Sequence, residues 1–132
     1  MDNITNNLPE LLILIFILIV FLQSGLDKLF DWKGNLSWLK GHFGETFLKG
    51  FVPLMVGIIM IIEIITGLYA LAGIYSLVAH NNPTTGLTAL VLAAITLLML
   101  LFGQRIAKDY AGAFTITGYF IVVLFGIYLF TA

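Results

Sequence analysis

Four long apolar stretches dominate the chain and constrain its fold more than any other feature. They cover residues 8–30, 51–79, 86–103 and 110–130. A transmembrane helix needs about 20 apolar residues, with a usual range of roughly 17–25, and each stretch is long enough. The short connections 80–85 and 104–109 make successive helices antiparallel neighbours. The sequence therefore predicts an all-α, polytopic membrane protein, in which residues 1–132 form a single domain built as an antiparallel four-helix bundle.

Composition supports the same conclusion. The protein is 61% hydrophobic and 10% charged, whereas about 25% of the residues of an ordinary soluble domain are charged. So little charge cannot cover a water-facing surface, and we expect the lipid bilayer to surround the bundle. The net charge of -1 gives no basis for binding nucleic acid.

The first connection, residues 31–50, is longer than the others and has a helical pattern of its own. Asn35 is placed to cap a short helix. Four apolar residues follow at spacings of three and four: Leu36, Leu39, Phe43 and Phe47. Trp32 and Trp38 lie in the same segment, and indole rings are common at the membrane–water interface. We expect a short amphipathic helix lying in that interface, with a loop packed on the bundle as the alternative.

The basic residues predict the orientation of the chain. All six lie at one end of the predicted bundle: Lys28, Lys33, Lys40, Lys49, Arg105 and Lys108. Loops that carry Lys and Arg stay in the cytoplasm. We therefore expect loops 31–50 and 104–109 to be cytoplasmic and both termini to be periplasmic.

Glu63 is the residue that most strongly indicates a function. It lies near the middle of the second apolar stretch, where a carboxylate costs several kcal/mol unless it is protonated, paired or hydrated. If Phe30 and Phe51 are level, Glu63 is about 18 Å deep and Lys28 only about 3 Å deep, which leaves too large a gap for a direct salt bridge. Without a cation at that depth, we expect Glu63 to be neutral.

Polar side chains at comparable depth are then the expected hydrogen-bond partners of Glu63. They are Gln23, Thr96, Thr115, Thr117 and Tyr119. In the functional interpretation, Glu63 exchanges protons or binds a ligand. In the structural interpretation, its protonated carboxyl links helices by hydrogen bonds, which contribute about 1 kcal/mol each in membranes.

A second polar cluster is predicted at the cytoplasmic end of the bundle. Its members are Asp27, Lys28, Gln104, Arg105, Lys108, Asp109 and Tyr110. Adjacent helix ends would allow Asp27 to pair with Arg105, and Lys28 to pair with Asp109. The cluster forms either a small polar vestibule leading towards Glu63 or a set of charges that anchor helix ends at the headgroups.

Several kinds of chemistry have no support in the sequence. The chain has no cysteine, which excludes disulfides and cysteine-ligated metals. His42 and His80 are expected on opposite sides of the membrane, so they cannot share a metal or a haem within one chain. No nucleophile–histidine–acid set and no glycine-rich phosphate loop is present. We assign no catalytic residue, no metal site and no evident cofactor.

Two segments resemble the DoxX family of small four-helix membrane proteins. Residues 21–29 (FLQSGLDKL) are similar to the family's small-polar Gly-x-x-Lys-Leu ending of the first helix. Residues 62–68 (IEIITGL) are similar to its glutamate in the second helix, followed by glycine-bearing apolar turns. The resemblance marks Gly25, Lys28 and Glu63, and it implies a bacterial inner membrane. Family members are associated with membrane-bound oxidoreductases, including a quinone-reducing thiosulfate oxidoreductase, so a quinone is a possible cofactor.

Three functions follow as hypotheses. The first is an accessory or structural subunit that is not an enzyme on its own, and that binds other membrane proteins or copies of itself. The second is a quinone-linked oxidoreductase subunit in which Glu63 exchanges protons. The third is a small transporter or proton path centred on Glu63. The residues expected to bind a ligand are Gln23, Asp27, Lys28, Glu63, Arg105, Asp109 and Tyr119.

Overall fold

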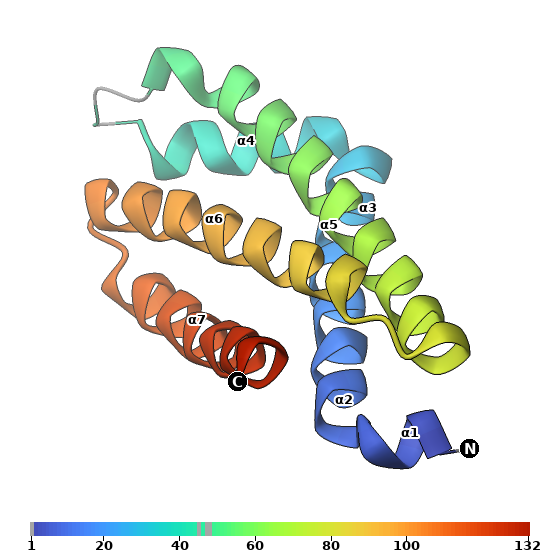
Figure 1. Cartoon of the computed structure of the whole chain (residues 1–132). Helices are drawn as coiled ribbons and strands as arrows, with labels where there is room; N and C mark the ends of the chain where they lie inside the picture. Colours follow the sequence, from blue (N-terminus) through green and yellow to red (C-terminus); the bar gives the residue numbers. More distant parts are fainter. Residues whose placement is uncertain (1, 45, 47–48) are drawn as a thin grey trace.

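The structure of the protein, a computed structural model, describes residues 2–44, 46 and 49–132 (Figure 1). Among these residues, four helical segments are long and apolar enough to cross a membrane, which confirms the predicted bundle. The first span, Leu8–Phe30, consists of α2 (Leu8–Ile17), the π-helical η1 (Leu18–Leu22) and α3 (Gln23–Phe30). The other spans are α5 (Val52–His80), α6 (Thr84–Ile106) and α7 (Tyr110–Thr131). The shorter elements are α1 (Asp2–Asn6), α4 (Trp32–His42) and the 3-10 turn η2 (Lys49–Phe51).

The amphipathic helix predicted in the first connection is α4. Its first turn follows Asp31 rather than the predicted cap Asn35, which lies inside the helix. The Asn35 Nδ2 atom instead donates to the backbone oxygens of Asp27 (3.3 Å) and Asp31 (2.9 Å), and so it connects α3 to α4. Leu36, Leu39 and Phe43 form the apolar face that packs near the start of α5. Phe47 lies outside the described residues.

Helix α5 is the centre of the bundle, because it packs against the first span, α4 and α6. In Figure 1 the first span crosses α5 at a steep angle, while α4 returns beside the first part of α5. Helix α6 packs against α5 on one side and against α7 on the other. The main core lies where the first span meets α5, α6 and α7, and it includes Leu14, Ile17, Phe21, Leu90 and Val123.

Small residues allow α5 and α6 to pack closely. Asn81, with a φ of 52°, ends α5 in the left-handed conformation that terminates many helices, and Pro83 precedes α6. A Cβ atom added to Gly73 would lie 2.6 Å from the Gly86 Cα, so neither backbone leaves room for a side chain there. Ala70 and Ala89 are both fully buried one turn further along this interface. Such small residues hold helices together in membranes, where no hydrophobic driving force acts between them.

Candidate functional site

Lys28 and Glu63 form an ion pair between α3 and α5. The Lys28 Nζ atom lies 2.8 Å from the Glu63 Oε1, and the two side chains are 16% and 4% exposed, respectively. Lys28 also donates to the Ser24 Oγ at 2.8 Å, one turn earlier in α3. The sequence-based prediction that Lys28 cannot reach Glu63 is therefore wrong. The expectation of a neutral Glu63 rested on the absence of a cation within reach, and the Lys28 contact removes that premise.

The relative position of the first span and α5 explains the error. A Cβ on Gly25 would lie 3.4 Å from the Glu63 Cβ, and a Cβ on Gly67 would lie 2.9 Å from the Leu22 Cβ. The end of α3 is therefore level with the interior of α5, not with its first residue. Helix α4 follows α3 and packs against the first turns of α5. Phe30 therefore lies level with the interior of α5, well beyond Phe51 at its start.

Two local features of the first span bring its backbone close to Glu63. Gly25 lacks a side chain, and a Cβ there would lie 2.6 Å from the Ile64 Cγ1 and 3.2 Å from the Ile64 backbone nitrogen. Immediately before α3, residues Leu18–Leu22 form a π-helical turn. A π-bulge adds a residue to a helix and turns the residues that follow it, and such bulges are common at functional sites.

The surroundings of Glu63 are incompletely hydrogen-bonded. The Glu63 Oε1 contacts the Lys28 Nζ, but no donor in the described part of the chain is aligned for a hydrogen bond to it. The Thr66 Oγ1, one turn further along α5, is buried and has no hydrogen-bond partner among the described residues. An unsatisfied buried polar group costs roughly 1–3 kcal/mol. The buried end of this ion pair therefore retains unused hydrogen-bonding capacity.

None of the predicted hydroxyl or amide partners bonds to Glu63 in the described structure. Gln23 is exposed, and the Tyr119 ring packs edge-on against Phe16 with centroids 5.9 Å apart. The three threonines each donate to a backbone oxygen one turn back in their own helices: Thr96 to Leu92, Thr115 to Ala111 and Thr117 to Ala113. Counting from the Gly73–Gly86 contact nevertheless places Thr96 at the level of Glu63, as predicted.

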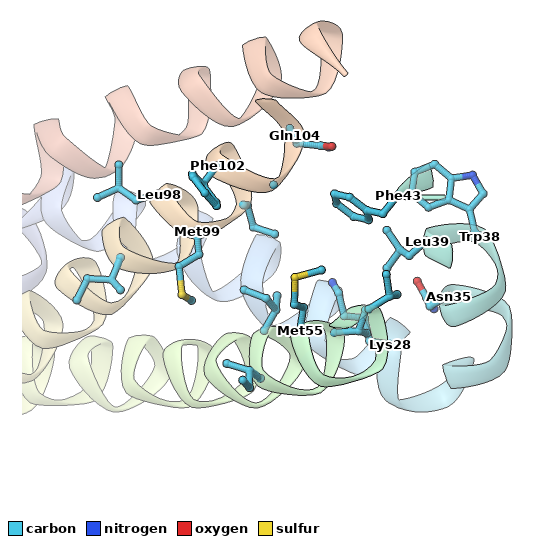
Figure 2. A pocket seen from close by; sticks show the side chains of 17 residues that line it. Lys28, Asn35, Trp38, Leu39, Phe43, Met55, Leu98, Met99, Phe102 and Gln104 are labelled. Atoms are coloured by element: carbon cyan, nitrogen blue, oxygen red, sulfur yellow. The ribbon is translucent and has the colours of Figure 1, made fainter. Parts of the chain in front are cut away.

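A cavity of about 670 Å³ lies beside the ion pair, between α4, α5 and α6 (Figure 2). Lys28 is the one charged residue that lines it among the described residues. The other polar side chains are Asn35, Trp38 and Gln104, and the remaining lining is apolar and includes Met55, Met99 and Phe102. Figure 2 shows the Lys28 side chain extending towards the cavity near Met55. The sequence analysis missed this cavity, because it depends on how α4 returns along α5.

The cavity borders the outer surface of the bundle. Ile58, Ile95, Leu98 and Phe102 line it and are also exposed large hydrophobic residues. On a membrane-spanning helix, such exposed apolar side chains face lipid. The lining on α6 begins at Ile95, halfway along the helix, and ends at Gln104, near its end. The exposed apolar residues that line the cavity therefore come from α5 and α6.

The predicted cluster at the end of the bundle is arranged differently from expectation. Asp27 is exposed, and the Arg105 guanidinium lies 5.0 Å from the centre of the Tyr110 ring, so the predicted Asp27–Arg105 pair is absent. The Lys28–Asp109 pair is absent because Lys28 contacts Glu63. The Asp109 Oδ1 accepts a hydrogen bond from the Gly112 backbone nitrogen at 2.9 Å and caps α7.

His42 joins this cluster and was not predicted as part of the site. Its Nε2 atom lies 2.9 Å from the Gln104 Oε1 and 3.6 Å from the Asp109 Oδ2. Its ring also stacks on Trp38, with centroids 4.8 Å apart. Through these contacts His42 connects the end of α4 to α6 and to the start of α7. No group of three or more potential metal ligands occurs among the residues that were described.

Comparison of the chain with models of known protein families, with curated proteins and with solved structures found no match.

Proposed function

We propose that this membrane protein binds a single amphipathic molecule, taken up from the bilayer, in the cavity beside Lys28. The observation that carries the proposal is a cavity of about 670 Å³ with an apolar lining that is partly exposed on the surface of the bundle and, among the described residues, one charged side chain. Small-molecule sites have volumes of about 300–1,000 Å³, mostly apolar walls and a few polar groups that orient the ligand. The cavity has all three properties.

The polar groups define what kind of head the ligand carries. A lysine ammonium has only donors, so the group it binds must accept hydrogen bonds. The polar lining residues come from α3, α4 and the last turn of α6, whereas the lining from the middle of α6 is apolar. An amphipathic molecule would place its head near Lys28, Asn35 and Gln104, and its chain along Ile95 and Leu98.

A quinone satisfies these requirements, because its carbonyl oxygens accept hydrogen bonds and its tail is apolar. The resemblance to the DoxX family favours the same class, and we propose membership of that family together with a bacterial inner-membrane location. In that case Lys28, Gly25 and Glu63 would be the residues that the family shares. The role as an accessory subunit remains a prediction, as does the proton path through Glu63.

The two tryptophans provide a direct test. Trp38 lines the cavity and Trp32 packs beside Val52 and Val56, so both report on one end of the site. The protein in lipid nanodiscs would be titrated with a short-chain benzoquinone, which quenches indole fluorescence on contact. We expect saturable quenching. Quenching that rises linearly, as simple partitioning into lipid predicts, would exclude a quinone as the ligand.

A matched pair of glycine variants locates the binding site. Gly103 lines the cavity, whereas Gly118 on α7 has no atom within 4 Å of an added Cβ. Gly103→Phe fills the cavity, so we expect at least a tenfold loss of quinone affinity; Gly118→Phe should bind like the unmodified protein. Helix content by circular dichroism would verify that both variants fold. Equal affinities in the two variants would place the quinone elsewhere.

A further inference from the structure

We infer that the ligand of this cavity is a single-chain carboxylic acid, and that the acid binds together with one proton that keeps the site electrically neutral. The inference rests on the proposed function and specifies the ligand's head. Three observations carry it: the charge of the cavity lining, the buried partner of that charge, and the size of the cavity.

The charge that faces the cavity is positive. Lys28 lines the cavity, whereas its partner Glu63 is not among the lining residues. A cationic head would therefore meet an ammonium and be repelled. A hydrogen bond between an ammonium and a carboxylate is roughly twice as strong as one between neutral groups, so a carboxyl head gains more from Lys28 than a ketone or an ester does. The Lys28 Nζ atom contacts the Ser24 Oγ at 2.8 Å, the Ser24 backbone oxygen at 3.4 Å and the Glu63 Oε1 at 2.8 Å, so a ligand carboxylate would replace the long contact to the Ser24 backbone oxygen.

The net charge of the occupied site favours a weak acid over a permanently charged anion as the ligand. Lys28 and Glu63 together carry no net charge, and a permanently anionic head would add an uncompensated negative charge inside an apolar bundle. A carboxylic acid enters from lipid with its own proton. The occupied site then contains one ammonium, two carboxyl groups that both contact it, and one proton held by either carboxyl, and its net charge stays zero. Glu63 does not line the cavity, so the ligand's carboxyl acts on it across Lys28, and two carboxyls this close resist ionising together.

The cavity volume indicates a single chain. About 670 Å³ lies within the range of small-molecule sites and suits one acyl chain rather than a two-chain phospholipid. Met55 and Met99 are among the lining residues, and unbranched methionine side chains adapt to a flexible chain. The deeper lining residues on α6, Ile95 and Leu98, are apolar and exposed, so they can contact the chain and its lipid neighbours.

Few titratable groups near the cavity could take up a proton when the acid binds. Lys28 and Glu63 form the ion pair itself, Asp27 on α3 is exposed, and the polar lining from α4 and α6 is neutral. His42 contacts the cavity lining through Gln104 and through the stacked Trp38 ring, and Asp109 lies beside His42. Binding of an ionised acid from water must therefore be accompanied by uptake of one proton at the Glu63–ligand pair.

The first experiment needs no variant. The protein in nanodiscs would be titrated with four probes that share a ten-carbon chain: decanoic acid, its methyl ester, decanesulfonate and a decyl-trimethylammonium salt. We expect decanoic acid to bind at least tenfold more tightly than each of the other three. Equal binding of the ester would overturn the carboxylic-acid inference, but it would still support a binding site for an amphipathic molecule. If neither these four probes nor the quinone binds saturably, both the carboxylic-acid inference and the proposed function are wrong.

The second experiment counts protons by calorimetry in buffers of different ionisation enthalpy, at a pH where free decanoic acid is ionised. The unmodified protein should take up close to one proton per acid bound.

The Glu63→Gln variant leaves Lys28 unpaired, so it should bind both decanoate and decanesulfonate tightly and take up close to no protons. Lys28→Gln should lose the preference for the acid over the ester. His42→Gln should leave the proton count unchanged. A count that is the same with and without Glu63, or one that follows His42, would overturn the proposal.

Discussion

At the scale of single residues, Lys28 and Glu63 stabilise each other inside an apolar bundle where either charge alone is costly. Removal of one partner of a buried ion pair costs roughly 3–5 kcal/mol, whereas replacement of both partners by apolar residues is often neutral. Lys28 is 16% exposed, so its loss should cost less than the loss of a fully buried charge.

The variants Lys28→Met, Glu63→Met and the double variant test this coupling. We expect Glu63→Met to be the least stable of the three, because it leaves the Lys28 ammonium unpaired beside apolar residues. The double variant should recover most of the lost stability. Unfolding in mixed micelles with increasing sodium dodecyl sulfate, followed by circular dichroism at 222 nm, measures the free energies. If the two single effects simply add in the double variant, the pair contributes nothing to stability.

At the scale of helices, Gly25 determines how closely α3 approaches α5. An alanine Cβ at this position would lie 2.6 Å from the Ile64 Cγ1 and 3.2 Å from the Ile64 backbone nitrogen, which cannot move aside as a side chain can. Gly25→Ala should therefore separate the helices and weaken the Lys28–Glu63 contact. We expect a loss of about 1–3 kcal/mol, as is typical of overpacking.

Gly118→Ala is the matched control, since an added Cβ there meets no atom within 4 Å. It should leave stability unchanged or raise it by roughly 0.5–1 kcal/mol, because alanine is the better helix former. Thermal unfolding of both variants in the same detergent makes the comparison. A stable Gly25→Ala together with an unstable Gly118→Ala would contradict the packing of α3 on α5.

Helix packing also explains which parts of the site the sequence could predict. Glu63 was identifiable because a carboxylate within a membrane span is rare and costly. Its partner was not, because the level of Lys28 along α5 depends on the close approach at Gly25 and on the return of α4. His42 was assigned to a loop, and only the course of α4 brings it to Gln104 and Asp109. Side-chain spacing within one segment predicts a helix, but it does not determine the level at which two helices meet.

At the scale of the whole molecule, the four spans were predictable almost to the residue. Their length and apolar composition are dictated by the thickness of the bilayer, so the prediction did not depend on how the helices pack. Helix α6 extends beyond the predicted 86–103 at both ends, to Thr84 and Ile106, because a helix continues into polar residues such as Gln104 and Arg105. The cavity depends on packing between α3, α4, α5 and α6, and no sequence pattern within any one of them predicts it.

The orientation of the bundle across the membrane is open to a direct test, because the sequence contains no cysteine. A single introduced cysteine would therefore be the only reactive thiol. Gly41 lies at the end of α4 in open space, and Ala132 is the exposed last residue. All six basic residues lie near the connections on the side of Gly41, so the distribution of charge predicts that this side is cytoplasmic. In intact bacterial cells whose outer membrane is permeable to small reagents, a charged maleimide should label Ala132→Cys. It should label Gly41→Cys only after the inner membrane is disrupted. The opposite labelling pattern would invert the bundle and place the Gln104 end of the cavity on the periplasmic side.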